Sequence, residues 1–207
     1  MNELACRLRD AILLVDSAVL PGKQLPLIVF DCRPNPGHPQ FGFVRDLSGA
    51  GRDSYWVYSQ GIDEYFEEGR MRHLKSIELA NTHNILAKLE PNDFCLQEMV
   101  PYDEGEAILA SAFHEVRHRI QFQPGVVLFN DGHTNQVERC RLWGQLQARH
   151  YKNEPNGELE FDAKFFECYG VLELRQGCLN TDAEQLRNFL SMTPYWFLKK
   201  EKKKNKR

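Results

Sequence analysis

The segment from residue 104 to residue 122 carries the clearest helical pattern in the sequence. Its apolar residues step by four, three and four, as expected for one buried face of an α-helix: Leu109, Phe113, Val116 and Ile120. Pro124 and Gly125 follow and end the pattern. A helix with such a face must pack against other elements, so the rest of the fold has to surround it.

The same segment contains the sequence HEVRH, an HExxH motif whose histidines are His114 and His118. Residues four apart lie one turn above each other on a helix, so both imidazoles can reach one metal ion. Glu115 is rotated from His114 by about 100°, which lets its carboxylate reach a water at the metal without being a ligand. The motif therefore predicts a hydrolytic Zn²⁺ site in which Glu115 is the general base.

Two histidines do not complete a catalytic zinc site, which normally has three protein ligands and a water. The metzincin pattern is excluded, because it would require Gly and His where this chain has Gln121 and Pro124. A glutamate from a later helix is the other common solution. The acidic helical segment that begins near residue 158 is the expected source.

These two segments resemble a known family. HExRHxxQ, from His114 to Gln121, followed by ExxAxxF, which begins at Glu160, is similar to the minimal zincin metallopeptidases of the gluzincin type, including ImmA/IrrE-like and phage-associated proteins. The resemblance implies that Glu160 is the third zinc ligand and that the small Ala163 lets its helix approach the metal-binding helix. The family usually has Asp or Asn where this chain has Lys164.

The ExxxD form of the motif leaves an alternative, in which Glu158 is the ligand and Asp162 is a carboxylate that orients a histidine. Two further side chains, His133 and Tyr169, are candidates for stabilising a tetrahedral oxyanion, as auxiliary residues do in similar peptidases. Arg117 lies on another face of the helix, and we expect it to form a structural ion pair.

Other segments follow the patterns of short strands and amphipathic helices. We expect helices at 4–19, 63–72, 76–89, 136–151, 158–174 and 181–192, the last with a capping box at Thr181, and strands at 25–32, 41–45, 54–59 and 94–100. The predicted fold is α+β and zincin-like: a small N-terminal mixed or antiparallel sheet, then a mainly helical half that carries the HExxH helix. Residues 1–198 are expected to form a single domain.

Charge divides the chain into an acidic body and a basic end. Residues 199–207 hold seven basic residues and one acidic residue, which leaves a net charge of −9 for the preceding 198. We expect this tail to be disordered. The six cysteines are widely spaced and predict reduced thiols. Because neither a secretory signal nor a membrane-spanning segment is recognisable, the expected location is cytoplasmic, without membrane contact.

Together these features predict a zinc-dependent metallopeptidase that acts on a protein or peptide substrate. The alternative is a non-catalytic regulatory or interaction protein that keeps the zincin scaffold. Such a protein would contact nucleic acid only through the basic tail. The presence of Glu115 favours the enzyme, because a binding module does not need that carboxylate.

Overall fold

The computed structural model describes residues 3–31, 41–45, 53–58, 67, 100, 102–192, 194 and 196. Apart from single positions, the helices expected at 63–72 and 76–89 and the strand expected at 94–100 lie outside these residues. The basic tail at 199–207 lies outside them as well.

The described elements begin with one helix and a small sheet and continue as helices. In chain order they are α1 (Glu3–Val19), β1 (Leu27–Asp31), β2 (Phe41–Val44), β3 (Ser54–Tyr58), α4 (Glu104–Gln121), α5 (Asp131–Thr134), the 3₁₀ helix η2 (Glu138–Cys140), α6 (Arg141–Tyr151), α7 (Gly157–Arg175) and α8 (Ala183–Leu190). This mainly helical chain with a small sheet is compatible with the expected α+β class.

The described sheet has three strands in the order β1-β3-β2. Strand β1 runs parallel to β3, with Leu27 opposite Ser54. Strand β2 runs antiparallel to β3, with Phe43 opposite Tyr55. Among the described strands, β2 therefore lies at an edge of this sheet.

A buried polar network joins the sheet to α1 and α4. The hydroxyl of Tyr55 donates to Asp16 Oδ2 at 2.8 Å, and Arg119 Nη1 donates to the two oxygens of Asp16 at 2.5 and 2.7 Å. Arg119 Nη2 also donates to the carbonyl of Gln24 at 2.8 Å. Because the charged members are paired and buried, this network holds β3 against the helices and brings β2 next to α4.

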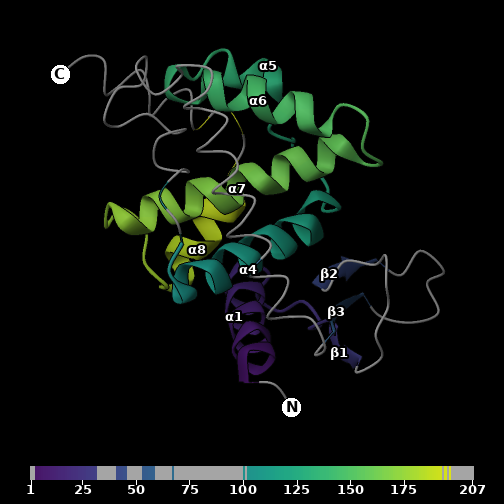
Figure 1. Ribbon diagram of the computed structural model, residues 1–207. Helices are drawn as coiled ribbons and strands as arrows, with labels where there is room; N and C mark the ends of the chain where they lie inside the picture. Colours follow the sequence, from purple (N-terminus) through teal and green to yellow (C-terminus); the bar gives the residue numbers. More distant parts are fainter. Residues whose placement is uncertain are drawn as a thin grey trace.

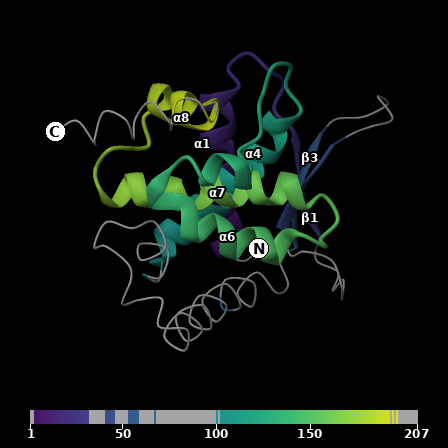
Figure 2. The same ribbon diagram turned by 90° about the horizontal axis from the view of Figure 1, so that it is seen from above.

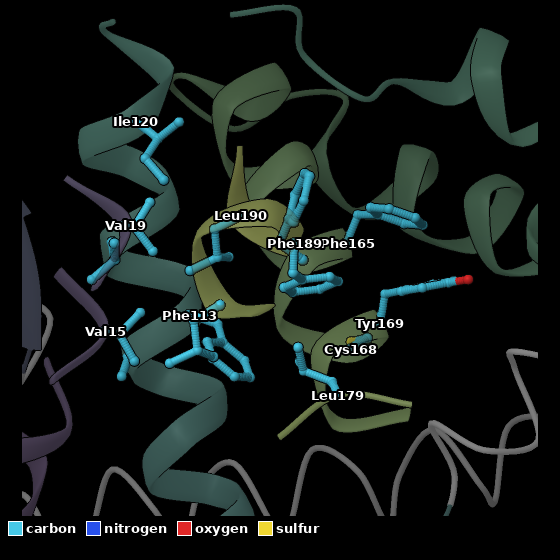
Figure 3. Close-up of a cluster of buried hydrophobic side chains, with 14 of the residues drawn as sticks. Val15, Val19, Phe113, Ile120, Phe165, Cys168, Tyr169, Leu179, Phe189 and Leu190 are labelled. Atoms are coloured by element: carbon cyan, nitrogen blue, oxygen red, sulfur yellow. The ribbon is translucent and has the colours of Figure 1, made fainter. Parts of the chain in front are cut away.

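Five of the described helices, α1, α4, α6, α7 and α8, share one apolar core. Helix α7 packs against α4 and also against α6, while α1 packs against α4 and α8 (Figure 1). Figure 2 shows the same arrangement turned by 90°, with the strands beside α4. In Figure 3, Phe113 of α4 lies next to Phe189 and Leu190 of α8, and Val15 and Val19 approach from α1. Of the apolar face expected for α4, Phe113, Val116 and Ile120 are buried, and Leu109 is partly buried against the core.

The helix expected at 136–151 begins later than the pattern indicated. Val137 has an extended backbone (φ −106°, ψ 97°) and a side chain only 1% exposed, and it is followed by η2 and then by α6 from Arg141. The burial of Val137 in this extended conformation keeps the helix from starting at residue 136. The short helix α5 lies before Val137. The prediction failed here because a tertiary contact outweighed the local periodicity.

The capping box expected at Thr181 is also wrong. Helix α8 begins at Ala183, and the carboxylate of Asp182 accepts the backbone N–H groups of Glu184 and Gln185 at 3.0 and 3.2 Å. A carboxylate is favoured at this position because it is charged and the N-terminus of a helix carries partial positive charge.

Candidate metal centre

The start of helix α4 is fixed by a capping box, and this also fixes where its two histidines lie along the helix axis. Asp103 Oδ1 accepts the N–H of Glu106 at 2.8 Å, and Glu106 Oε2 accepts the N–H of Asp103 at 3.0 Å, so the two form a capping box. The apolar face packs in the core, and the adjacent face carries His114 and His118. Their side chains are 16% and 13% exposed.

Glu160 reaches both histidines from the first turn of α7. That helix follows a turn in which Asn156 has a left-handed backbone (φ 59°), and Gly157 lies so close to the carbonyl of Tyr151 that a Cβ would not fit. Glu160 Oε2 lies 3.3 Å from His114 Nε2, and Glu160 Oε1 lies 3.4 Å from His118 Nε2. The turn therefore aims this carboxylate at the HExxH face.

The three side chains form a group that could hold a metal ion. One ligand atom from each of His114, His118 and Glu160 lies within 4.8 Å of the others, and the two Nε2 atoms are 3.1 Å apart. Ligands about 2.0–2.1 Å from a tetrahedral zinc would lie about 3.3 Å from each other. The separation of the two Nε2 atoms is close to that spacing, and Glu160 brings one oxygen near each of them, so these residues could hold a metal ion.

Hydrogen bonds at the second ring nitrogen orient both imidazoles. His114 Nδ1 lies 3.1 Å from Glu167 Oε2, and His118 Nδ1 lies 3.0 Å from Gln121 Oε1. The amide nitrogen of Gln121 donates to Asp162 Oδ2 and to the carbonyl of Leu159, both at 2.8 Å, which leaves its oxygen facing the ring. Both rings can therefore carry their proton on Nδ1 and present Nε2 to a metal.

Among the described residues, the site has more carboxylates than ammonium groups. The carboxylates of Glu115, Glu160 and Glu167 lie at the site together with the ammonium of Lys164, which is 2.6 Å from Glu167. Burial alone would lower the pKa of His114, but hydrogen bonds with Glu160 and Glu167 outweigh it and raise the pKa to about 10. The site thus attracts a positive charge, which a proton on His114 or a divalent cation can supply.

Glu115 lies beside the group and contacts the sheet. Its carboxylate is 6% exposed, and its Oε2 accepts the backbone N–H of Phe43 in β2 at 2.7 Å. Since this N–H is used by Glu115, it points away from β3. The carboxylate is therefore held between the HExxH helix and the edge strand.

Arg117 forms the structural ion pair expected from its place on the helix. Its Nε and Nη2 donate to Asp162 at 2.7 and 3.0 Å, and Nη1 donates to the carbonyl of Leu190 at 2.8 Å. Asp162 also accepts the N–H of Phe129 at 2.7 Å. Asp162 makes no hydrogen bond to His114 or His118, unlike the alternative in which it orients one of them. Gln121 lies between Asp162 and His118 and contacts both.

The remaining sequence candidates lie elsewhere. Glu158 is exposed and outside the metal group. The ring of His133 accepts the N–H of Asn130 at 3.3 Å and stacks on Phe129. Tyr169 follows Glu160 by nine residues, about 13.5 Å along the helix and on its opposite face, and it packs against the core with its hydroxyl turned away (Figure 3).

Sequence reasoning did not identify Glu167, the supporting role of Gln121, or Tyr151. Two sequence spacings could have indicated the first two. Glu167 follows Glu160 by two helical turns and Gln121 follows His118 by three residues, so each lies on the same helix face as its partner. Tyr151 ends α6 near the site. Burial raises its pKa, and the charges of Glu167 and Glu160 raise it further. Only the tertiary structure places this tyrosine there.

No protein-family model, curated protein or solved structure matches this chain. Among the described helices, none has both the length and the apolar character needed to cross a membrane.

Proposed function

We propose that the chain is a zinc-dependent metallopeptidase of the minimal zincin type. The observation that carries the proposal is the convergence of His114, His118 and Glu160 within 4.8 Å of each other, beside the carboxylate of Glu115. A zinc ion held by these residues would lower the pKa of a water molecule and polarise a substrate carbonyl.

Each residue of the site has a separate role in the proposed reaction. His114, His118 and Glu160 hold the metal, and Gln121 keeps the ring of His118 in place. Glu115 takes a proton from the attacking water as the new C–O bond forms. It then passes this proton to the amine nitrogen as the C–N bond breaks.

The edge strand favours a peptide substrate. The N–H of Phe43 points toward Glu115 and away from β3, and no described strand pairs with this side of β2. An extended peptide that pairs with this side would place its backbone beside Glu115, where main-chain hydrogen bonds contribute to binding. Selection of the substrate would then depend on backbone conformation as well as on side chains.

A comparison of the wild type with Glu115→Gln tests the proposal. Both proteins should bind zinc at one ion per chain, measured by mass spectrometry, because Glu115 is not a ligand. Cleavage of a peptide library should fall by about 10²- to 10⁴-fold in the variant, since it lacks the base. Glu158→Gln, an exposed change on α7, is the matched control and should cleave like the wild type.

Two outcomes would contradict the proposal. Equal cleavage by the wild type and Glu115→Gln would exclude Glu115 as the base. A zinc-loaded wild type that cleaves no member of the library, and shows no more activity than Glu115→Gln, would favour the non-catalytic alternative.

A further inference from the structure

Glu167 is a largely buried carboxylate that faces the site without belonging to its three-membered metal group. It lies two helical turns after Glu160 on the same face of α7. Its side chain is 15% exposed, compared with 37% for Glu160. One oxygen lies 3.1 Å from His114 Nδ1, and the other lies 2.6 Å from Lys164 Nζ. Both oxygens are therefore engaged in charged or polar contacts.

We infer that Glu167 is a positioning residue for His114 and that Lys164 anchors it. The Nδ1–H of His114 donates to Glu167, which fixes the rotation of the ring. It also makes Nε2 the free nitrogen, and Nε2 is the atom that faces Glu160 and His118. A carboxylate at Nδ1 also increases the basicity of the imidazole. This role rests on the proposed metal site.

The geometry separates this role from that of a fourth ligand. Glu167 contacts the ring nitrogen opposite the one that faces the other two ligands, so a metal bound to Nε2 would be out of its reach. It also differs from an exposed ion pair on a helix surface, because the carboxylate is largely buried. Lys164 has no acceptor and cannot bind the Nδ1–H itself. Its contribution is to hold and neutralise Glu167.

The two imidazoles are oriented by different groups. His118 is held by the neutral amide of Gln121, whereas His114 is held by a carboxylate. The ring of His114 should therefore depend on Glu167 for both its orientation and its basicity. Removing Glu167 should weaken metal binding even though all three ligands remain.

Zinc affinity, measured by competition with a chelator, tests the inference. Glu167→Ala should bind zinc about 10- to 100-fold more weakly than the wild type. Glu167→Gln should recover a large part of that loss, because its amide oxygen still accepts the Nδ1–H. Glu158→Ala is the control and should bind like the wild type. Circular dichroism establishes that each variant is folded.

A second readout reports on the ring directly. In the zinc-loaded wild type, the Nδ1-bound proton of His114 should be visible by NMR. It should exchange faster or disappear in Glu167→Ala. The double variant Lys164→Met/Glu167→Ala should bind zinc no more weakly than Glu167→Ala, because Lys164 acts through Glu167. A further loss would contradict the role of Lys164.

Two results would overturn the proposed role of Glu167, and only one of them would also contradict the proposed peptidase function. If folded Glu167→Ala binds zinc as tightly as the wild type, Glu167 does not position His114, and the proposed peptidase stands. If the wild type binds no zinc, both the proposed function and the role of Glu167 are wrong.

Discussion

Arg117 and Asp162 form a two-pronged ion pair that is completely buried between α4 and α7. Both side chains are 0% exposed. The guanidinium also lies 4.0 Å above the ring of Phe166 and donates to the carbonyl of Leu190. Because Asp162 also binds Gln121, the pair connects the helix crossing to the residue that orients His118. The contact that holds the two helices together therefore also supports the candidate metal centre.

Replacing Asp162 by Asn should strongly destabilise the fold. The substitution leaves the buried Arg117 without an opposing charge, which costs about 3–5 kcal/mol of unfolding free energy. Urea denaturation measures the change. Asp10→Asn, which breaks an exposed pair with Arg9, is the control and should change stability by less than about 1 kcal/mol. Similar losses in the two variants would mean that burial of the Arg117 pair is unimportant.

The third ligand can be tested with two glutamates in the first turn of α7. Glu160→Gln should lose stoichiometric zinc, because a neutral amide is a poor replacement for a carboxylate that contacts both histidines. Glu158→Gln should keep it, since Glu158 is exposed and lies outside the group. Mass spectrometry of the purified proteins gives the zinc content. Retention of zinc by Glu160→Gln would exclude Glu160 as a required ligand.

Gly170 should tolerate no larger residue at the crossing of α4 and α7. A Cβ at this position would lie 2.5 Å from Cδ2 of the fully buried Phe113. The clash in Gly170→Ala should therefore lower the unfolding free energy by about 1–3 kcal/mol. The higher helix propensity of Ala should offset part of this loss.

Gly105 on α4 provides the matched comparison for Gly170. It is exposed, and its added Cβ would meet nothing closer than Asp103 Oδ1 at 3.4 Å. Gly105→Ala should be neutral or stabilising by up to about 1 kcal/mol. Equal stability of the two alanine variants, measured by thermal or urea unfolding, would show that the core accommodates the extra methyl group.

The pair of Glu106 and Arg175 should make stability depend on pH. Hydrogen bonds from Arg175 at 2.8 and 2.7 Å outweigh burial and lower the pKa of Glu106 from its ordinary value of 4.5. Because the folded pKa is lower than the unfolded one, this carboxylate stabilises the fold above pH 4.5. The contribution is lost as the pH falls through the folded pKa.

Glu106→Gln isolates this contribution while keeping an acceptor for the capping box. The variant should be less stable than the wild type at neutral pH, and the difference should shrink as the solution is acidified. Urea midpoints measured across that range provide the comparison. A difference that stays constant with pH would mean that the charge of Glu106 is not responsible.

Much of the site followed from local geometry. His114, Glu115 and His118 belong to one helix, so their relative directions are set by its period and could be predicted without any knowledge of the fold. The bounds of α1, α4 and α7 could also be predicted, because the apolar periodicity of each segment closely matches the observed helix. Predictions failed at Val137 and Thr181, where burial and the stronger acceptor Asp182 decided the helix boundaries.

The sequence by itself determined which helix carries the two histidines and the neighbouring carboxylate, because the helical repeat relates residues only within one helix. It left Glu160 and Glu158 as alternatives, and it did not identify Glu167 or the N–H of Phe43. The tertiary structure places Glu160 beside both histidines and leaves Glu158 exposed, and it brings Glu167 to His114 and Phe43 to Glu115. His114 meets Glu167 across 53 residues of sequence, and Glu115 meets Phe43 across 72. Such contacts depend on how α7 and β2 are rotated against α4, which is set by packing and buried ion pairs distributed over the whole core.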